Sequence, residues 1–261
     1  HRHIFAGEPF GQGTFWGKWR GRYGTKLRGR PLRLVRGLLG QALGDMETWL
    51  FVIESTDGPT PDGVYTVVAT DLLKLADGDR ALAPRPSNGF LVAAITDTAT
   101  SATLSPSGIG DLEYPASGYV AIGGKEICQF TRAGDVLTLT RSVTVPGTSY
   151  ETEVAEHDSG SRVQLCLSYT AEDPADIIAD LLETYAGVAT GYIPIEDWQT
   201  ETAAFRQTLY TTLIAEPTSV KKLASELVGQ AALAGWWDAA GRQIRLQAVR
   251  QISTLAAEIT E

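Results

Sequence analysis

GYVAIGGKEICQFTRAGDVLTLTRSVT, residues 118–144, is the stretch that decides the fold of this chain. Gly118–Ile122, Glu126–Thr131 and Val136–Thr144 are short runs rich in apolar, aromatic and β-branched residues, and leucine alternates with threonine in the third, which is typical of β-strands. The pair Gly123-Gly124 suits a tight hairpin, because glycine adopts positive φ at both central positions of the turn. Ala133-Gly134-Asp135 marks the second turn. The stretch therefore predicts an antiparallel meander of three strands.

Runs of β-branched and aromatic residues on both sides of the meander predict further strands. They are residues 49–55, 64–70, 90–95, 102–104 and 163–167. Asp71 is placed to cap a short helical turn at 72–76. We therefore expect a β module at residues 32–89 and a barrel-like or sandwich-like β module at residues 90–170.

The pattern changes at Asp173, which is a typical helix N-cap followed by Pro174 at the first helical position. The helix is expected to end at Gly187, and further helices are expected after Pro194 and after Pro217. A hairpin of 231–237 and 242–249 follows across residues 238–241. Residues 171–261 thus form a mixed helix–hairpin domain, expected to continue beyond Glu261, and the predicted fold class is α+β.

Composition and chain ends limit the possible contexts. The chain has 261 residues and is 43% hydrophobic, so it is long and apolar enough to bury a real core. No apolar run approaches the ~18–20 residues that a membrane helix needs, so no membrane partner is expected. Cys128 and Cys166 do not make a disulfide framework, which favours synthesis in a reducing compartment. Because the chain begins with His1 and stops after a strand-like stretch, a fragment of a longer polypeptide is favoured over a deliberately shortened chain.

Charge is distributed unevenly. Residues 1–36 contain nine Lys and Arg against one acid, a net +8, so the other 225 residues carry −17 of the total −9. Residues 1–31 are expected to form a basic arm with interleaved aromatic residues or an incomplete N-terminal element, and the charge suits nucleic acid, a membrane surface or an acidic neighbouring protein. An acidic body repels DNA, so subunit contact is favoured. The candidate interface residues are Trp16, Trp19, Arg20, Arg22, Tyr23, Arg28 and Arg30.

The sequence lacks the patterns of common catalytic and cofactor sites. The segment Gly13–Lys18 fails the phosphate-loop pattern, and Gly11-Gln12-Gly13 lacks the third glycine of a dinucleotide site, where Trp16 stands. No Gly-x-Ser-x-Gly elbow is present. His1 and His3 stand at the chain end, and Asp57/Asp62 and Asp77/Asp79 lie beside glycines, which is turn chemistry. We therefore predict no enzyme, no cofactor and no metal.

His157 is the one histidine with acidic neighbours in sequence, in Glu156-His157-Asp158. This cluster is either a metal or acid–base site or a hydrogen-bonded turn. Because no cysteine or second histidine lies nearby in sequence, the turn is favoured. Cys128 and Cys166 lie on predicted strands, and two thiols alone do not hold a zinc or iron–sulfur site.

A set of short patterns from Gly118 to Val163 resembles the tail hub proteins of long-tailed bacteriophages. It comprises Gly118-Tyr119-Val120-Ala121-Ile122-Gly123, a strand ending in Thr140-Arg141, then Gly147-Thr148, His157, Gly160 and Val163. Weaker likeness extends over residues 30–250. The sequence departs from the family pattern at Ser142 after Arg141 and in the nine residues from Thr148 to His157.

The resemblance implies a homotrimeric structural protein at the tail tip of the virion, assembled in the host cytoplasm. Its implied partners are the distal tail ring or tube, the tape measure protein and the tip or fibre, and nucleic acid would only pass through its channel. One alternative is a nucleic-acid-binding module that uses the basic arm. Another is a carbohydrate-active or peptidase domain, which would need positioned carboxylates among Asp57, Asp62, Glu156 and Asp158.

Overall fold

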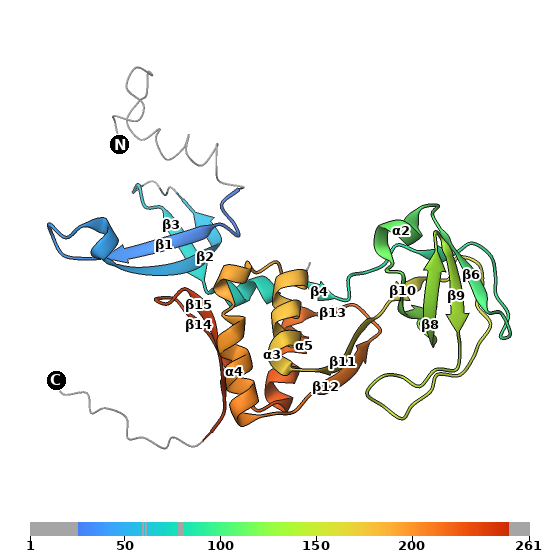
Figure 1. Cartoon of the computed structure of the whole chain (residues 1–261). Coiled ribbons are helices and arrows are strands. Elements are labelled where there is room, and N and C mark those ends of the chain that lie inside the picture. Colours follow the sequence, from blue (N-terminus) through green and yellow to red (C-terminus); the bar gives the residue numbers. More distant parts are fainter. Residues whose placement is uncertain (1–25, 59, 61, 78–80, 251–261) are drawn as a thin grey trace. The chain divides into compact units, whose positions relative to one another are not determined.

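The structure is a computed structural model that describes residues 26–58, 60, 62–77 and 81–250 (Figure 1). The chain divides into two compact units. The first holds the described residues up to Leu75 together with Trp236–Ile244, and the second holds Ala76–Gly235 and the described residues from Arg245. Residues 76–89, which the sequence placed in the first β module, thus belong to the second unit.

The first unit is built on a three-stranded antiparallel sheet, β1 (Pro31–Arg36), β2 (Glu47–Asp57) and β3 (Thr66–Thr70), in that spatial order. The central strand β2 contains the run Thr-Trp-Leu-Phe-Val-Ile, whose β-branched and aromatic residues favour extended backbone. A register shift between Ile53 and Ser55 bulges β2 against β3. Two 3₁₀ turns, η3 (Leu43–Asp45) and η4 (Leu72–Asp77), complete the connections, and η4 confirms the predicted helical turn.

The second unit begins with a six-stranded antiparallel sheet in the order β10-β7-β8-β9-β6-β5. Its strands are β5 (Phe90–Leu91), β6 (Ser101–Ser105), β7 (Ser117–Ile122), β8 (Glu126–Ala133), β9 (Val136–Thr140) and β10 (Val163–Leu165). The meander β7-β8-β9 is the one predicted from residues 118–144. Gly123 and Gly124 have φ of 59° and 68°, which confirms the reason for the glycine pair.

This sheet curls until its two edge strands nearly meet, so it is barrel-like. The Leu91 N–H donates to the Ser161 carbonyl at 2.9 Å, and the Gly160 N–H donates to the Leu91 carbonyl at 2.8 Å. The Val163 N–H, at the start of β10, donates to the Gly89 carbonyl just before β5 at 2.9 Å. These bonds connect β5 to the residues that lead into β10, and β10 to the residue that leads into β5. They therefore bridge the gap between the two edge strands.

Alternating residues of the strands fill the barrel. Val120 and Ile122 of β7, Cys128 and Phe130 of β8, and Leu137 of β9 are almost completely buried. The intervening residues face outward, as period-2 alternation requires. Burial raises the pKa of the Cys128 thiol to about 12, which agrees with its predicted place in the core.

A short helix, α2 (Ile109–Glu113), lies against the barrel and was not predicted. The carboxylate of Asp135 holds its start, accepting from the N–H of Gly108 at 2.7 Å and of Gly110 at 2.8 Å. Because Asp135 belongs to the β8–β9 turn, more than twenty residues away, local patterns around 108–113 carry no sign of this cap.

The rest of the second unit combines helices with short strand pairs. The ribbon β11 (Leu167–Glu172) with β12 (Tyr210–Ile214) accompanies the helices α3 (Pro174–Asp180), α4 (Ile195–Phe205) and α5 (Val220–Gln230). A π-helical turn, η5 (Leu181–Tyr185), extends α3, and η6 (Thr190–Tyr192) is a 3₁₀ turn. β4 (Leu82–Ala83) pairs with β13 (Thr218–Ser219). Among the described residues, no helix is both long and apolar enough to cross a membrane.

The predicted start of α3 is confirmed. The Asp173 carboxylate accepts from the Ala175 N–H at 2.8 Å, and Pro174 is the first helical residue. The Thr202 hydroxyl of α4 also donates to this carboxylate at 2.9 Å, so one side chain caps α3 and joins two helices. Gly187, with φ of 72°, follows the π turn where the helix was expected to end.

The predicted carboxy-terminal hairpin is present as β14 (Leu233–Asp238) and β15 (Gln243–Ala248). Its tip, Trp236–Ile244, belongs to the first unit, where the Trp237 indole N–H donates to the Leu50 carbonyl of β2 at 2.9 Å. The mixture of a barrel-like sheet, smaller sheets and helices confirms the α+β class.

Several elements differ from the prediction, and of the strand expected at 90–95 only Phe90–Leu91 is present, as β5. β9 ends at Thr140 and not at Thr144, because Ser142 has φ of 55°, which no strand accommodates. The single strand expected at 163–167 is divided at Cys166 into β10 and β11, which pair with different partners. β12 was not predicted, because its run Tyr-Thr-Thr-Leu-Ile is short and carries no clear alternation.

Candidate assembly surfaces

The predicted interface residues fall into two groups. Trp16, Trp19, Arg20, Arg22 and Tyr23 lie outside the described residues. Arg28 and Arg30 lie in the turn that leads into β1, and both are exposed. The Arg30 carbonyl accepts from the Ile53 N–H at 2.9 Å, and the Gly29 N–H donates to the Ile53 carbonyl at 2.8 Å. The backbone of this basic turn is therefore fixed on the central strand β2.

The strand β1 continues the basic surface. Arg33 and Arg36 are exposed, so together with Arg28 and Arg30 they form four arginines within nine residues, here called the arginine strand. Among the described residues, none of the four forms an ion pair with a carboxylate. Cations that form no ion pair among the described residues remain available to an external anion or acidic protein surface.

Exposed apolar side chains accompany the arginine strand. Leu34 lies within it at 54% exposure, and Leu38 and Leu39 follow it at 80% and 108%. Val67 and Val68 of β3 are also exposed. Leucines at adjacent exposed positions, next to cations, are typical of protein contact surfaces. The sequence Arg36-Gly-Leu-Leu-Gly40 already indicates this exposure. Two adjacent leucines between glycines do not fit the apolar repeat of a helix or of a strand, so no regular element would bury both side chains.

β1 is also an edge strand of the described sheet, because it pairs only with β2. Arg30 bonds to β2, and backbone groups alternate in direction along a strand, so Arg33 and Val35 point theirs away from the sheet. Pro31 has no N–H to offer at the same edge. Proline and arginine on an edge oppose indiscriminate strand pairing, so this edge favours contact through side chains.

A buried ionic cluster lies within the second unit, and the sequence did not predict it. Glu126 of β8, with no exposed surface, accepts from Arg141 Nε at 2.8 Å and from Arg141 Nη2 at 2.5 Å. His157 Nε2 lies 3.0 Å from the same carboxylate, and the Ala155 N–H donates to it at 3.1 Å. We call Glu126, Arg141 and His157 the buried clamp.

The electrostatics of the clamp keep Glu126 ionised. Burial alone raises the pKa of this carboxyl, but the hydrogen bonds from Arg141, His157 and the Ala155 amide outweigh it, and the pKa falls to about 2. The Arg141 guanidinium also donates to the carbonyls of Thr96, at 2.5 Å, and of Ala155. The clamp therefore fastens two long loops to the barrel wall, and its polar atoms are occupied by these contacts.

The prediction for His157 needs correction. It is hydrogen-bonded, as expected, but it is buried, and its partner is Glu126, 31 residues away, and not a neighbour in a surface turn. Glu156 and Asp158 are exposed. Within the described part of the chain, no group of three His, Cys, Asp or Glu side chains is placed to hold a metal ion. Asp57 and Asp62 are exposed, Asp77 lies 3.2 Å from Lys221 Nζ, and Asp79 lies outside the described residues.

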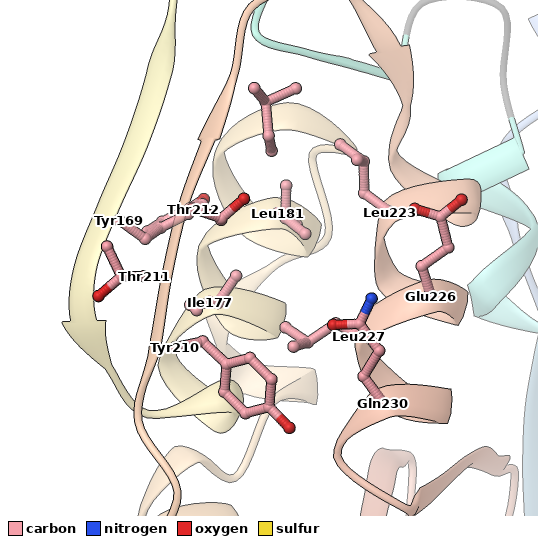
Figure 2. Close-up of a pocket in the computed structure, with 11 residues that line it drawn as sticks. Tyr169, Ile177, Leu181, Tyr210, Thr211, Thr212, Leu223, Glu226, Leu227 and Gln230 are labelled. Carbon is pink, nitrogen blue, oxygen red and sulfur yellow. The ribbon is translucent and has the colours of Figure 1, made fainter. Parts of the chain in front are cut away.

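A pocket lined by aliphatic and polar side chains lies between the β11–β12 ribbon and the helices α3 and α5 (Figure 2). Its volume is about 170 Å³. Ile177 and Leu181 form the floor, Leu223 and Leu227 of α5 form one wall, and Tyr210 and Thr212 of β12 form the other. The Tyr169 hydroxyl, on the ribbon, donates to Asp180 at 2.7 Å. Burial, and then this hydrogen bond and the charge of Asp180, raise the pKa of Tyr169.

Comparison with known proteins does not assign the chain to a family. No family model matches the sequence, no curated protein matches it, and no solved structure matches the fold.

Proposed function

We propose that this chain is a structural subunit that acts by holding other subunits, and that it has no catalytic role. The observation that carries the proposal is the arginine strand with its exposed leucines on the first unit. Arg33 and Arg36 have no ionic partner among the described residues, and Leu38 and Leu39 are left in solvent. An acidic protein surface with apolar residues would satisfy both groups at once.

In its finer form, the proposal is a segment of a phage tail hub. The chain would act as a homotrimer in the virion, joining the tail tube or distal ring to the tip or fibre, after assembly in the host cytoplasm. Support comes from the resemblance between Gly118 and Val163, which coincides with the barrel-like module. Further support comes from the charge distribution, because a ring of identical subunits needs two different, complementary surfaces on each copy.

Light scattering after size-exclusion chromatography tests the proposal through the mass of the assembly. We expect three times the mass of one chain, and Arg33→Glu should weaken the association roughly tenfold or more. Lys125→Glu, an equal charge change at an exposed residue of the β7–β8 loop, should leave the association unchanged. A chain that stays monomeric at every concentration would overturn the homotrimer.

Deletion of residues 1–30 gives a second test, since it removes the basic arm. We expect loss of assembly, while circular dichroism and cooperative unfolding of the barrel-containing unit persist. If the truncated chain assembles as the full chain does, the basic arm is not a subunit contact. If it loses cooperative unfolding, the arm is part of the fold.

The alternative function is nucleic-acid binding, which is also favoured by the four arginines that form no ion pair within the described chain. Association through phosphates weakens steeply with salt, with a slope of about −0.9 per neutralised phosphate for duplex DNA. A monomer that binds DNA with such a slope would favour this alternative. A trimer that does not bind DNA favours the structural role.

A further inference from the structure

The pocket between the β11–β12 ribbon and α5 has the size and lining of a site for one ring. Its volume of about 170 Å³ compares with the ~150 Å³ apolar cavities that hold benzene in other proteins. Ile177 and Leu181 supply an aliphatic floor, and Leu223 and Leu227 supply one aliphatic wall. The occupant they favour is a flat apolar side chain, because polar groups would lose hydrogen bonds to water on entry.

Three carboxylates, one on the lining of the pocket and two beside lining residues, are here called its border. Glu226 of α5 lines the pocket, Glu172 lies opposite Tyr210 in the ribbon, and Asp180 binds the hydroxyl of Tyr169. The nearest cation that pairs with this border is Lys222, whose Nζ lies 3.9 Å from Glu226. Three carboxylates against one ammonium make a border that favours cations on either side of an entering ring.

We propose that this pocket receives the side chain of Trp19 from a second copy of the chain. Trp19 stands directly between Lys18 and Arg20, so one short segment presents a ring and two flanking cations. The remaining 225 residues carry the compensating −17, so the segment and its receiving surface attract across copies. The inference rests on the proposed self-assembly and identifies one of its contacts.

The segment that contains Trp19 is expected to bind a different copy of the chain, because only contacts between copies hold an assembly together. A copy that offers a donor segment and a receiving pocket generates a closed ring when each segment enters its neighbour. A segment that filled the pocket of its own chain would occupy the site and leave no contact to share. The buried ring then acts as the anchor of the contact, which is the usual role of tryptophan at interfaces.

Photo-crosslinking in the full chain tests this contact directly. Benzoylphenylalanine replaces Trp19, and this chain is mixed with an equal amount of ¹⁵N-labelled unmodified chain before irradiation. We expect crosslinked peptides that join an unlabelled residue 19 to a labelled pocket peptide from 167–182, 210–214 or 220–230. The same group at Phe10, an aromatic residue without a flanking cation, should label the pocket roughly thirtyfold less.

Variants of the pocket distinguish binding of residue 19 inside the pocket from non-specific association between chains. Glu226→Lys removes the excess negative charge of the border, and Leu223→Trp fills the cavity, so both should reduce labelling from residue 19 at least tenfold. The matched changes on the same helix are Lys222→Glu and Ser225→Trp, which keep the border acidic and the pocket open. They should retain labelling, and circular dichroism verifies that every variant is folded.

Three outcomes overturn the inference. Crosslinks to the pocket found only within one isotopic copy would mean that the segment binds its own chain. Crosslinks from residue 19 to other regions, or none at all, would mean that the pocket is not its receptor. Equal labelling of the pocket from position 10 would show that the cations on either side of Trp19 do not determine which aromatic residue enters. Since the mass of the assembly is measured separately, a trimer without these crosslinks refutes the pocket contact and leaves the proposed function standing.

Discussion

Glu126→Gln removes the negative charge of the buried clamp while keeping the shape of the side chain. The change leaves the Arg141 guanidinium, whose side chain is 7% exposed, without its counter-charge. Removing one member of a buried ion pair typically costs about 3–5 kcal/mol. The fall of the Glu126 pKa from 4.5 to about 2 corresponds to at most about 3 kcal/mol, so a loss near 3 kcal/mol is expected.

Amide hydrogen exchange of peptides from β8 and β9 measures this loss in the barrel itself. For amides that exchange only when the barrel opens, about 3 kcal/mol corresponds to roughly a hundredfold faster exchange at neutral pH. The matched control is Asp111→Asn, which breaks the surface pair between Asp111 and Arg132, where the Asp111 side chain is 74% exposed. That change should cost less than about 1 kcal/mol and accelerate exchange less than about fivefold.

The pH dependence of the same comparison has a definite sign. Because the pKa of Glu126 is lower in the folded chain than in the unfolded chain, its contribution is present above pH 4.5. It is lost as the pH falls from 4.5 towards 2. The difference between wild type and Glu126→Gln should therefore shrink over that interval. A difference that is small at pH 7, or that does not change down to pH 2, would refute the ionised clamp.

Three further changes test particular contacts of the second unit. Asp173→Ala should cost about 1–2 kcal/mol in thermal or urea unfolding, because it removes the N-cap of α3 and the acceptor of the Thr202 hydroxyl; a neutral result would contradict the cap. Gly110→Ala should destabilise the barrel, since the added Cβ would lie 2.1 Å from a carbonyl oxygen of the β8–β9 turn, whereas Gly191→Ala, with open space around it, should have little effect on the melting temperature. Cys128 should resist iodoacetamide at pH 8 in the folded chain, because burial raises its pKa to about 12; rapid alkylation seen by intact mass would show that the barrel opens readily.

Local sequence patterns predicted the elements whose causes are local. The alternation and glycine turns of 118–140 specify the meander, and Asp173-Pro174 specifies the start of α3, because each signal lies within a few residues of the structure it produces. The helix expected after Pro217 is likewise present as α5. In these regions, the pattern of apolar residues and the turn or cap residues predict the same element, so the local sequence is sufficient to predict it.

The features that sequence reasoning missed depend on residues that are far apart in the chain. Glu126, Arg141 and His157 appeared as a strand residue, a strand end and a loop histidine, and no spacing between them is required for a clamp. The cap of α2 comes from Asp135, which looked like an ordinary turn residue. The basic arm was recognised from charge alone, but Arg33 and Arg36 became part of the surface only when β1 placed them beside exposed leucines.

The near-closure of the six-stranded sheet has a consequence for the time before assembly. Free strand edges are templates on which unrelated chains add strands, and this is a common origin of aggregation. In the barrel, backbone groups of Leu91, Gly160 and Val163 are already hydrogen-bonded between the two edges of the sheet. The largest sheet of the described chain therefore has few free backbone groups on which another chain could add a strand. In the structural role proposed above, the unassembled chain would therefore resist aggregation at high concentration, because its contacts with other subunits would be made through charged and apolar side chains and not through free strand edges.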